Sequence, residues 1–155
     1  MHDHHLRKIF KGGKLEDRQI NNKIEFFIPL EKIPTATGQQ KKITWSHKAN
    51  KPIIYDAPLL RKAKEIFKSN LYKYTPDSPL EGPLRLVTKW CYGTKDKTRI
   101  GQYKDTKPDT DNIIKAFKDQ MTKLRFWEDD AQVASEITEK FWNDVPGIYV
   151  KVERL

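Results

Sequence analysis

One stretch of this 155-residue chain, residues 107–133, constrains the fold more than any other. Apolar side chains recur in it at spacings of three, four and three residues, at Ile114, Phe117, Met121 and Leu124. This is the pattern of one apolar face on a helix with 3.6 residues per turn. Pro108 stands just ahead, and either Asp109 or Thr110 can serve as the N-cap. The pattern therefore predicts an amphipathic helix that packs on a core.

Two acidic groups flank the predicted helix. Asp109 and Asp111 stand one residue apart at its start, and a second group follows its exit turn, at Glu128, Asp129 and Asp130. One interpretation is structural, because acidic residues in the first turn cap a helix and suit its dipole. The other is a metal site, because Mg²⁺ is usually held by one or two carboxylates together with waters and phosphate oxygens. A cap needs only one carboxylate, and the chain has two here, which favours the metal site.

The metal-site interpretation predicts that Asp109, Asp111 and Asp130 converge on one divalent ion, with Mg²⁺ expected and Mn²⁺ as a substitute. The start and the end of the helix are about 20 Å apart at a rise of 1.5 Å per residue. The carboxylates therefore meet only if the chain doubles back after Trp127. Residues 132–142 have a mixed pattern that we interpret as a strand, which provides the return.

Lys115 lies four residues after Asp111, so both side chains occupy one face of the predicted helix. Either they form an ordinary surface ion pair, or the ammonium neutralises charge on a phosphate oxygen beside the carboxylates. A calcium-binding EF-hand is a poor fit, because a loop starting at Asp109 would need Gly and Glu where the chain has Ile114 and Gln120. Carboxylates grouped in this way suit metal-assisted hydrolysis at phosphorus.

The stretch KPDTDNIIKAFKDQM, followed by FWEDDAQV, resembles the motif of the RusA-type Holliday junction resolvases. The shared features are a basic residue before D-x-D-N, a lysine four residues after the second aspartate, and an aromatic turn that leads into D-D-x-x-V. The resemblance covers about 27 of the 155 residues. It is specific because these features occur together and in the same order.

The resemblance implies a small Mg²⁺-dependent endonuclease of bacteria and their phages or prophages, which acts as a homodimer on four-way DNA junctions. It also implies that the catalytic, metal-binding carboxylates are Asp109, Asp111 and Asp130. Lys115 carries over as the essential basic residue. Two further positions match the motif with roles that the motif leaves open: Asn112 and Asp129.

Charge is distributed unevenly along the chain. Residues 1–100 contain 21 Lys and Arg against 10 Asp and Glu, a balance of +11, and residues 101–155 contain 9 against 11, a balance of −2. Together these give the net charge of +9. A basic body around an acidic site suits a polyanion such as DNA that is cleaved with a metal.

Two basic segments are the expected DNA contacts. The first, residues 93–107, leads directly into Asp109 and carries Lys95, Lys97, Arg99, Lys104 and Lys107. The second, residues 32–50, is interpreted as a mobile loop that carries Lys41 and Lys42, with candidate short strands at residues 43–45 and, just after the loop, 52–55. Its Trp45 either packs on the protein or stacks on an exposed base. In both segments the alternative is an ordinary solvated loop.

A single cysteine, Cys91, excludes an intramolecular disulfide, fits a reducing compartment and is expected to be buried. No apolar run approaches the roughly 18 residues of a membrane span. The N-terminus lacks the apolar segment of a signal peptide. These features predict a cytoplasmic protein with no membrane partner.

The expected fold class is α+β, with a mixed, mostly antiparallel sheet of about four to five strands and two main helices in a single domain. Residues 1–22 are expected to form a flexible N-terminal arm and residues 23–155 a RusA-like endonuclease domain. Strands are predicted at residues 23–30, 84–92 and 148–155. The second helix is predicted over about residues 56–72, with Asp56 as its N-cap.

The predicted function is a Mg²⁺-dependent, structure-selective endonuclease that resolves four-way DNA junctions in recombination and repair. One alternative is a Mg²⁺-dependent nuclease for other branched or flap DNA. A second alternative is a non-catalytic DNA-binding protein whose carboxylates merely cap the helix.

Overall fold

A computed structural model of the chain describes residues 22–35 and 41–155. Its strands and α-helices, in chain order, are β1 (Lys23–Pro29), β2 (Lys41–Ser46), β3 (Lys51–Asp56), α2 (Pro58–Leu71), β4 (Leu84–Gly93), α3 (Thr110–Lys123), β5 (Val133–Asn143) and β6 (Gly147–Arg154). Three short 3-10 helices lie between them: η2 (Tyr72–Tyr74), η3 (Lys97–Arg99) and η4 (Asp130–Gln132). The predicted N-terminal arm lies outside the described residues, except for Asn22.

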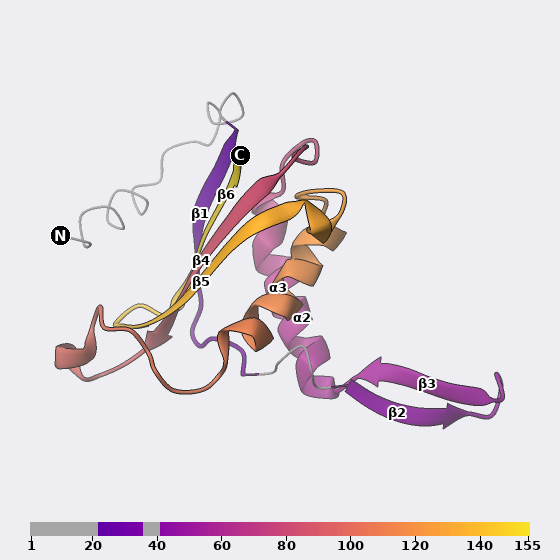
Figure 1. Cartoon of the computed structure of the whole chain (residues 1–155). Helices are drawn as coiled ribbons and strands as arrows, with labels where there is room; N and C mark the ends of the chain where they lie inside the picture. Colours follow the sequence, from indigo (N-terminus) through magenta and orange to yellow (C-terminus); the bar gives the residue numbers. More distant parts are fainter. Residues whose placement is uncertain (1–21, 36–40) are drawn as a thin grey trace.

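Four strands form one sheet in the order β1-β6-β4-β5. The β1–β6 and β6–β4 pairs are antiparallel, whereas β4 and β5 are parallel. A parallel pair needs a crossover connection, and α3 provides it here. Both long helices cover the same side of the sheet (Figure 1). The predicted α+β class, with a mixed and mostly antiparallel sheet, is confirmed.

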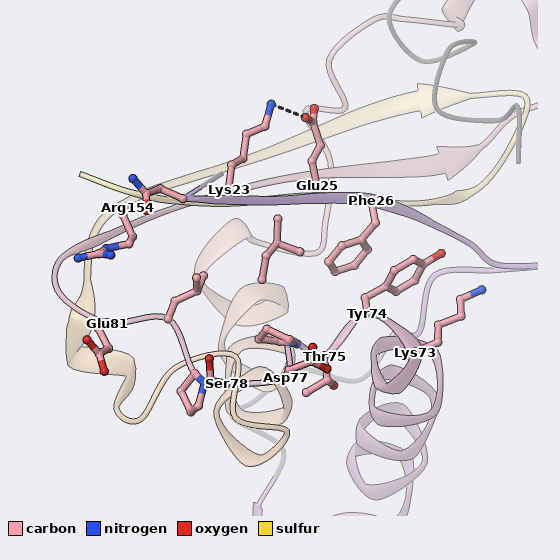
Figure 2. A pocket seen from close by; sticks show the side chains of 15 residues that line it. Lys23, Glu25, Phe26, Lys73, Tyr74, Thr75, Asp77, Ser78, Glu81 and Arg154 are labelled. Atoms are coloured by element: carbon pink, nitrogen blue, oxygen red, sulfur yellow. Dashed lines mark ion pairs between the residues drawn. The ribbon is translucent and has the colours of Figure 1, made fainter. Parts of the chain in front are cut away.

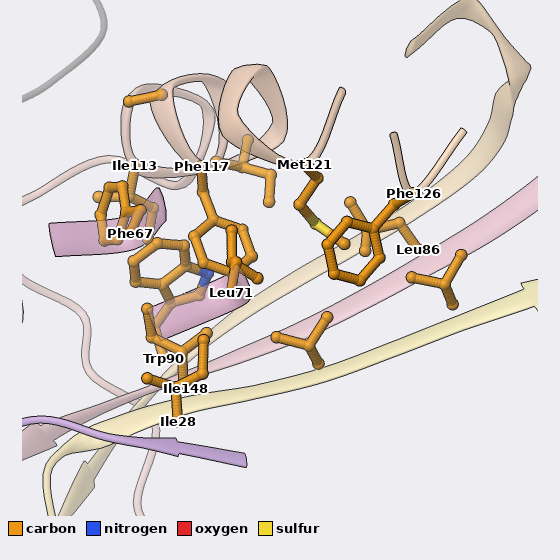
Figure 3. Packing of buried hydrophobic residues seen from close by; sticks show 14 of the residues in the cluster. Ile28, Phe67, Leu71, Leu86, Trp90, Ile113, Phe117, Met121, Phe126 and Ile148 are labelled. Atoms are coloured by element: carbon orange, nitrogen blue, oxygen red, sulfur yellow. The ribbon is translucent and has the colours of Figure 1, made fainter. Parts of the chain in front are cut away.

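The core lies between this sheet and the two helices. Trp90 on β4 is fully buried and meets the rings of Phe67 on α2 and Phe117 on α3 edge to face, at centroid distances of 5.8 and 5.4 Å (Figure 3). Such edge-to-face contacts add to the free energy gained by burying the rings. The helical spacing predicted from the sequence is confirmed, because Ile114, Phe117 and Met121 are all buried in this core.

The start of α2 differs from the prediction. Its N-cap is Ala57, which makes no side-chain capping bond, and Pro58 occupies the first helical turn. Asp56 instead ends β3, and its carboxylate accepts a hydrogen bond from Lys64 Nζ at 2.8 Å. A proline at the first helical position needs no N–H partner, so the helix starts without the predicted cap.

The predicted mobile loop is in part a β-hairpin, formed by β2 and β3, that extends away from the sheet and the helices (Figure 1). Cross-strand pairing puts Ile43 opposite Ile54 and Trp45 opposite Pro52, so the four share one face. The exposed fractions of Ile43, Ile54 and Trp45 are 72%, 66% and 52%. Trp45 is therefore not a core residue, and the hairpin presents an apolar face to its surroundings. Residues 36–40 of the predicted loop lie outside the described residues.

Cys91 lies on β4 and is a buried free thiol, as predicted. Burial raises the pKa of this thiol to about 11, so it stays protonated and unreactive near neutral pH. In the described part of the chain, no helix is long and apolar enough to cross a membrane.

Candidate active site

The start of α3 carries two exposed carboxylates. Asp109 is the N-cap residue, yet its side chain makes no capping hydrogen bond, and Asp111 lies in the first turn. Across residues 22–35 and 41–155, neither carboxylate has a hydrogen-bond or ion-pair partner. The capping interpretation therefore does not account for Asp109. Both groups are available to bind a cation.

The acidic turn after α3 is built differently. Asp129 accepts a hydrogen bond from the Ala131 backbone N–H at 2.8 Å and forms a capping box with Gln132. Gln132 in turn accepts hydrogen bonds from the backbone N–H groups of Glu128 and Asp129. Asp130 is exposed and has no partner among the described residues. Among the described residues, the Asp129 side chain is therefore hydrogen-bonded within its own turn, whereas the Asp130 side chain is not.

The free carboxylates lie at opposite ends of α3. The Pro108 carbonyl, next to Asp109, is 2.7 Å from Nζ of Lys140, which is the eighth residue of β5. Asp130 lies three residues before the first residue of β5, and seven strand steps of about 3.3 Å, or roughly 23 Å, separate that first residue from Lys140. The chain does double back after Trp127, but Asp130 lies at the far turn. Within a single copy of the chain, the structure therefore does not bring Asp130 together with Asp109 and Asp111.

The acidic side chains of one copy do not form a complete metal site. Within the described residues, no group of three or more His, Cys, Asp or Glu side chains is placed to hold a metal ion. One copy of the chain provides a pair of carboxylates, Asp109 and Asp111, at the start of α3. A pair is within the number of protein carboxylates that usually hold Mg²⁺.

Lys115 is exposed on α3 and forms no ion pair with Asp111 or with any other described residue. Another lysine of α3 does form an ion pair. Lys118 Nζ is 2.8 Å from the Glu136 carboxylate of β5. The predicted surface ion pair is thus absent from the structure, and the Lys115 ammonium is free to meet an anion.

The basic residues between β4 and α3 fall into two kinds. Most of those predicted to contact DNA are exposed: Lys95, Lys97, Arg99 and Lys107. Arg99 also pairs with Asp96, at 3.6 Å. Lys104 differs, because its exposed fraction is only 8% and its ammonium points inward over the rings of Tyr92 and Trp142. We therefore exclude Lys104 from the DNA contacts.

A cavity of about 620 Å³ is lined by residues other than these carboxylates. It opens between β1 and the connector that follows η2, with the stacked rings of Phe26 and Tyr74 in its wall (Figure 2). None of its 15 lining residues belongs to the predicted site. An open, exposed site at a helix start is the arrangement expected for a large substrate rather than a small enclosed one.

Comparison with known proteins agrees with the motif. The model of the family described as endodeoxyribonuclease RusA matches residues 29–153. A crossover junction endodeoxyribonuclease rusA of Lactococcus phage r1t is 35% identical over 120 residues, which covers 72% of this chain and 82% of the relative. The matched range of the family model includes Asp109 and Asp111 at the start of α3. The chain is a member of the RusA family of endodeoxyribonucleases.

Proposed function

We propose that this protein is a Mg²⁺-dependent endonuclease that resolves four-way DNA junctions. Family membership supports the nuclease activity, and the phage relative, a crossover junction endodeoxyribonuclease, supports a junction as the substrate. The observation that carries the proposal is the start of α3. There Asp109 and Asp111 are exposed, have no partner among the residues that the structure describes, and directly follow a basic loop.

The two carboxylates fit a magnesium ion, because both offer hard oxygen ligands that the described part of the protein leaves unused. Mg²⁺ supplies an activated water and stabilises charge on the scissile phosphate when it is bound. Mn²⁺ also prefers oxygen ligands and is the expected substitute. Asp109 and Asp111 would hold the ion, and Asn112, half-buried in the same turn, lies next to them.

The third carboxylate, in our proposal, comes from a second copy of the chain. Asp130 has no partner among the described residues, but in the same copy it lies at the opposite end of the β5 segment from Val133 to Lys140, which is roughly 23 Å long. A two-fold symmetric dimer repeats every contact in both directions. If the end of one α3 meets the start of the other, both sites are completed at once. Two such sites suit a substrate in which two strands must be cut.

Lys115 completes the proposed site as a cation for the phosphate. It is four residues after Asp111, on the same face of α3, and has no acidic partner among the described residues. A fixed positive charge beside a phosphoryl oxygen stabilises the charge that develops in the transition state. This role uses the ammonium that a surface ion pair would have occupied.

Basic residues around the site are proposed to bind the phosphate backbone. The exposed ones next to α3 are Lys95, Lys97, Arg99 and Lys107. Lys42 on the β2–β3 hairpin is exposed too, beside the predicted contact Lys41. Trp45, on the apolar face of the hairpin, suits an unstacked base at the centre of a junction.

We also place the protein in the cytoplasm of a bacterial cell. The relative comes from a Lactococcus phage, which supports a phage or prophage origin. Cys91 is a free buried thiol, a form compatible with a reducing compartment.

Cleavage of a synthetic four-way junction, measured with and without Mg²⁺ beside a flap and a linear duplex, tests the proposal. We expect paired cuts in the junction only when the metal is present. Preferred cutting of the flap would indicate a nuclease for other branched DNA. Tight junction binding without cleavage under either Mg²⁺ or Mn²⁺ would indicate a non-catalytic DNA-binding protein.

A further inference from the structure

Two lysine side chains donate hydrogen bonds to the backbone of the segment that leads into Asp109. Lys140 Nζ on β5 donates to the Thr106 and Pro108 carbonyls, both at 2.7 Å. Lys104 Nζ donates to the same Thr106 carbonyl at 3.1 Å, and also to Thr106 Oγ1 and to the Lys107 carbonyl. Three consecutive carbonyls, at residues 106–108, are therefore held by two ammonium groups.

The Lys104 ammonium in this arrangement is largely removed from solvent. Lys104 is buried, and burial, followed by repulsion from the neighbouring Lys140, lowers its pKa. Neither ammonium has a carboxylate within ion-pair distance in the described part of the chain. Carbonyl dipoles and two aromatic faces replace it, with Lys104 Nζ 5.1 Å from the Tyr92 ring centre and 4.7 Å from that of Trp142. The charge of the neighbouring Asp105 only partly offsets this cost, so two adjacent cations without an ion-paired carboxylate are a poor way to stabilise a fold.

What the two lysines do control is the path of the chain. Backbone pairing to β5 ends where the Lys104 N–H donates to the Lys140 carbonyl, at 2.9 Å. The next backbone bond belongs to α3, from Ile113 N–H to the Asp109 carbonyl. Between these two points, the backbone of residues 105–108 makes no backbone–backbone hydrogen bond within the described structure. The lysine side chains supply hydrogen bonds to this segment in place of pairing with a neighbouring strand.

We propose that Lys104 and Lys140 are positioning residues, which fix residues 106–108 and thereby the placement of Asp109 and Asp111 for the metal. This inference rests on the proposed function of that site. Neither lysine touches the substrate or the ion; each acts through the carbonyls it holds. Comparable groups behind metal ligands in other proteins change metal affinity or activity by about 10–100-fold when they are removed.

Lys140→Met and Lys104→Met test the proposal, because methionine keeps an unbranched apolar stem and removes the donors. We expect the Mg²⁺ concentration for half-maximal cleavage to rise severalfold and the single-turnover rate to fall about 10–100-fold. Junction affinity without a divalent ion and the melting temperature should stay near wild-type values. Lys140→Arg, which keeps a cation with several donors, should recover most of the activity.

Lys118→Met is the matched control, because this lysine lies on α3 and pairs with Glu136 rather than with the loop. It should leave the Mg²⁺ response unchanged. Methionine variants of both positions that respond to Mg²⁺ like the wild type would overturn the proposal. So would a loss of junction affinity and melting temperature in parallel with activity, because that pattern indicates a general role in folding.

Mn²⁺ binding without DNA, followed by electron paramagnetic resonance, separates this inference from the proposed function. If the wild type binds Mn²⁺ but cuts no junction, the proposed substrate is wrong. The positioning role is then decided by whether Lys140→Met weakens Mn²⁺ binding. If the wild type cuts junctions and Lys140→Met binds Mn²⁺ equally well, only the positioning role is wrong.

Discussion

The two ends of α3 carry similar acidic residues, but the hydrogen bonding around these residues differs. At the exit, Asp129 and Gln132 satisfy the local backbone through a capping box, and Trp127 Nε1 donates to Thr122 Oγ1 at 2.8 Å. At the start, Asp109 caps nothing, and the backbone ahead of it depends on lysines from β5 and the preceding loop. Polar groups that a chain leaves without local partners are characteristic of functional positions. We therefore expect the exit to be mainly structural, apart from Asp130, and the start to be mainly functional.

Removing a carboxylate from the start of α3 should give the largest effect. Asp111→Asn is expected to lower single-turnover junction cleavage by roughly a thousandfold or more, about 4 kcal/mol of transition-state stabilisation. Junction binding should persist or tighten, because one negative charge beside the phosphate is gone. Asp119→Asn, on the same helix, is the control and should cut normally. An Asp111→Asn protein that cuts at a comparable rate would remove Asp111 from the site.

A mixed dimer should show whether the start of one α3 needs the exit of another. In a dimer of one Asp111→Asn copy and one Asp130→Asn copy, sharing across copies leaves one site intact, so nicking of one strand returns. Each variant alone should be inactive. Measured on a tagged, co-expressed heterodimer, this activity should reach about half of the wild-type nicking rate, one intact site in two.

The reverse combination is the control for this experiment. A wild-type copy paired with a copy that carries both substitutions has no intact site if carboxylates are shared. It would retain one if each copy supplied its own three carboxylates. Activity in this second heterodimer, and none in the first, would contradict the shared site.

Removing one lysine from each end of α3, Lys115 near the start and Lys123 near the exit, compares how much the two cations contribute to cleavage. Lys115→Ala is expected to lower single-turnover cleavage at least about tenfold, or roughly 1.4 kcal/mol, because a charge near the scissile phosphate is lost. Lys123→Ala removes an exposed cation from the last turn of α3 and should leave the rate unchanged. Both variants should melt within a few degrees of the wild type. Equal rates for the two would return Lys115 to the ordinary helix surface.

The start and the exit of α3 also differ in how far the sequence could predict them. Helical spacing from Ile114 to Met121 predicted the helix and its buried face, because that information is local. The distance from Asp109 to Asp130 depends on where the return strand begins and on its parallel pairing with β4, which no local pattern encodes. In the sequence, Lys104 was indistinguishable from the other basic residues of a polar loop. Its burial over Tyr92 and Trp142 depends on elements that are far apart in the chain. Lys140 gave no signal for the same reason.

The smallest expected effect separates the two neighbouring aspartates at the exit. Asp129→Ala removes the acceptor of the Ala131 N–H and should cost about 1 kcal/mol of unfolding free energy, which lowers the melting temperature by roughly 2–4 °C. Asp129→Asn keeps a capping oxygen, so it should melt like the wild type and cut within about threefold of its rate. Asp130→Asn should show the opposite behaviour, with an unchanged melting temperature and little cleavage, because its carboxylate has no partner in the described structure. Calorimetry and single-turnover cleavage on the three variants decide the matter. An Asp129→Asn protein that is stable but inactive would mean that the charge of Asp129, and not its cap, serves the site.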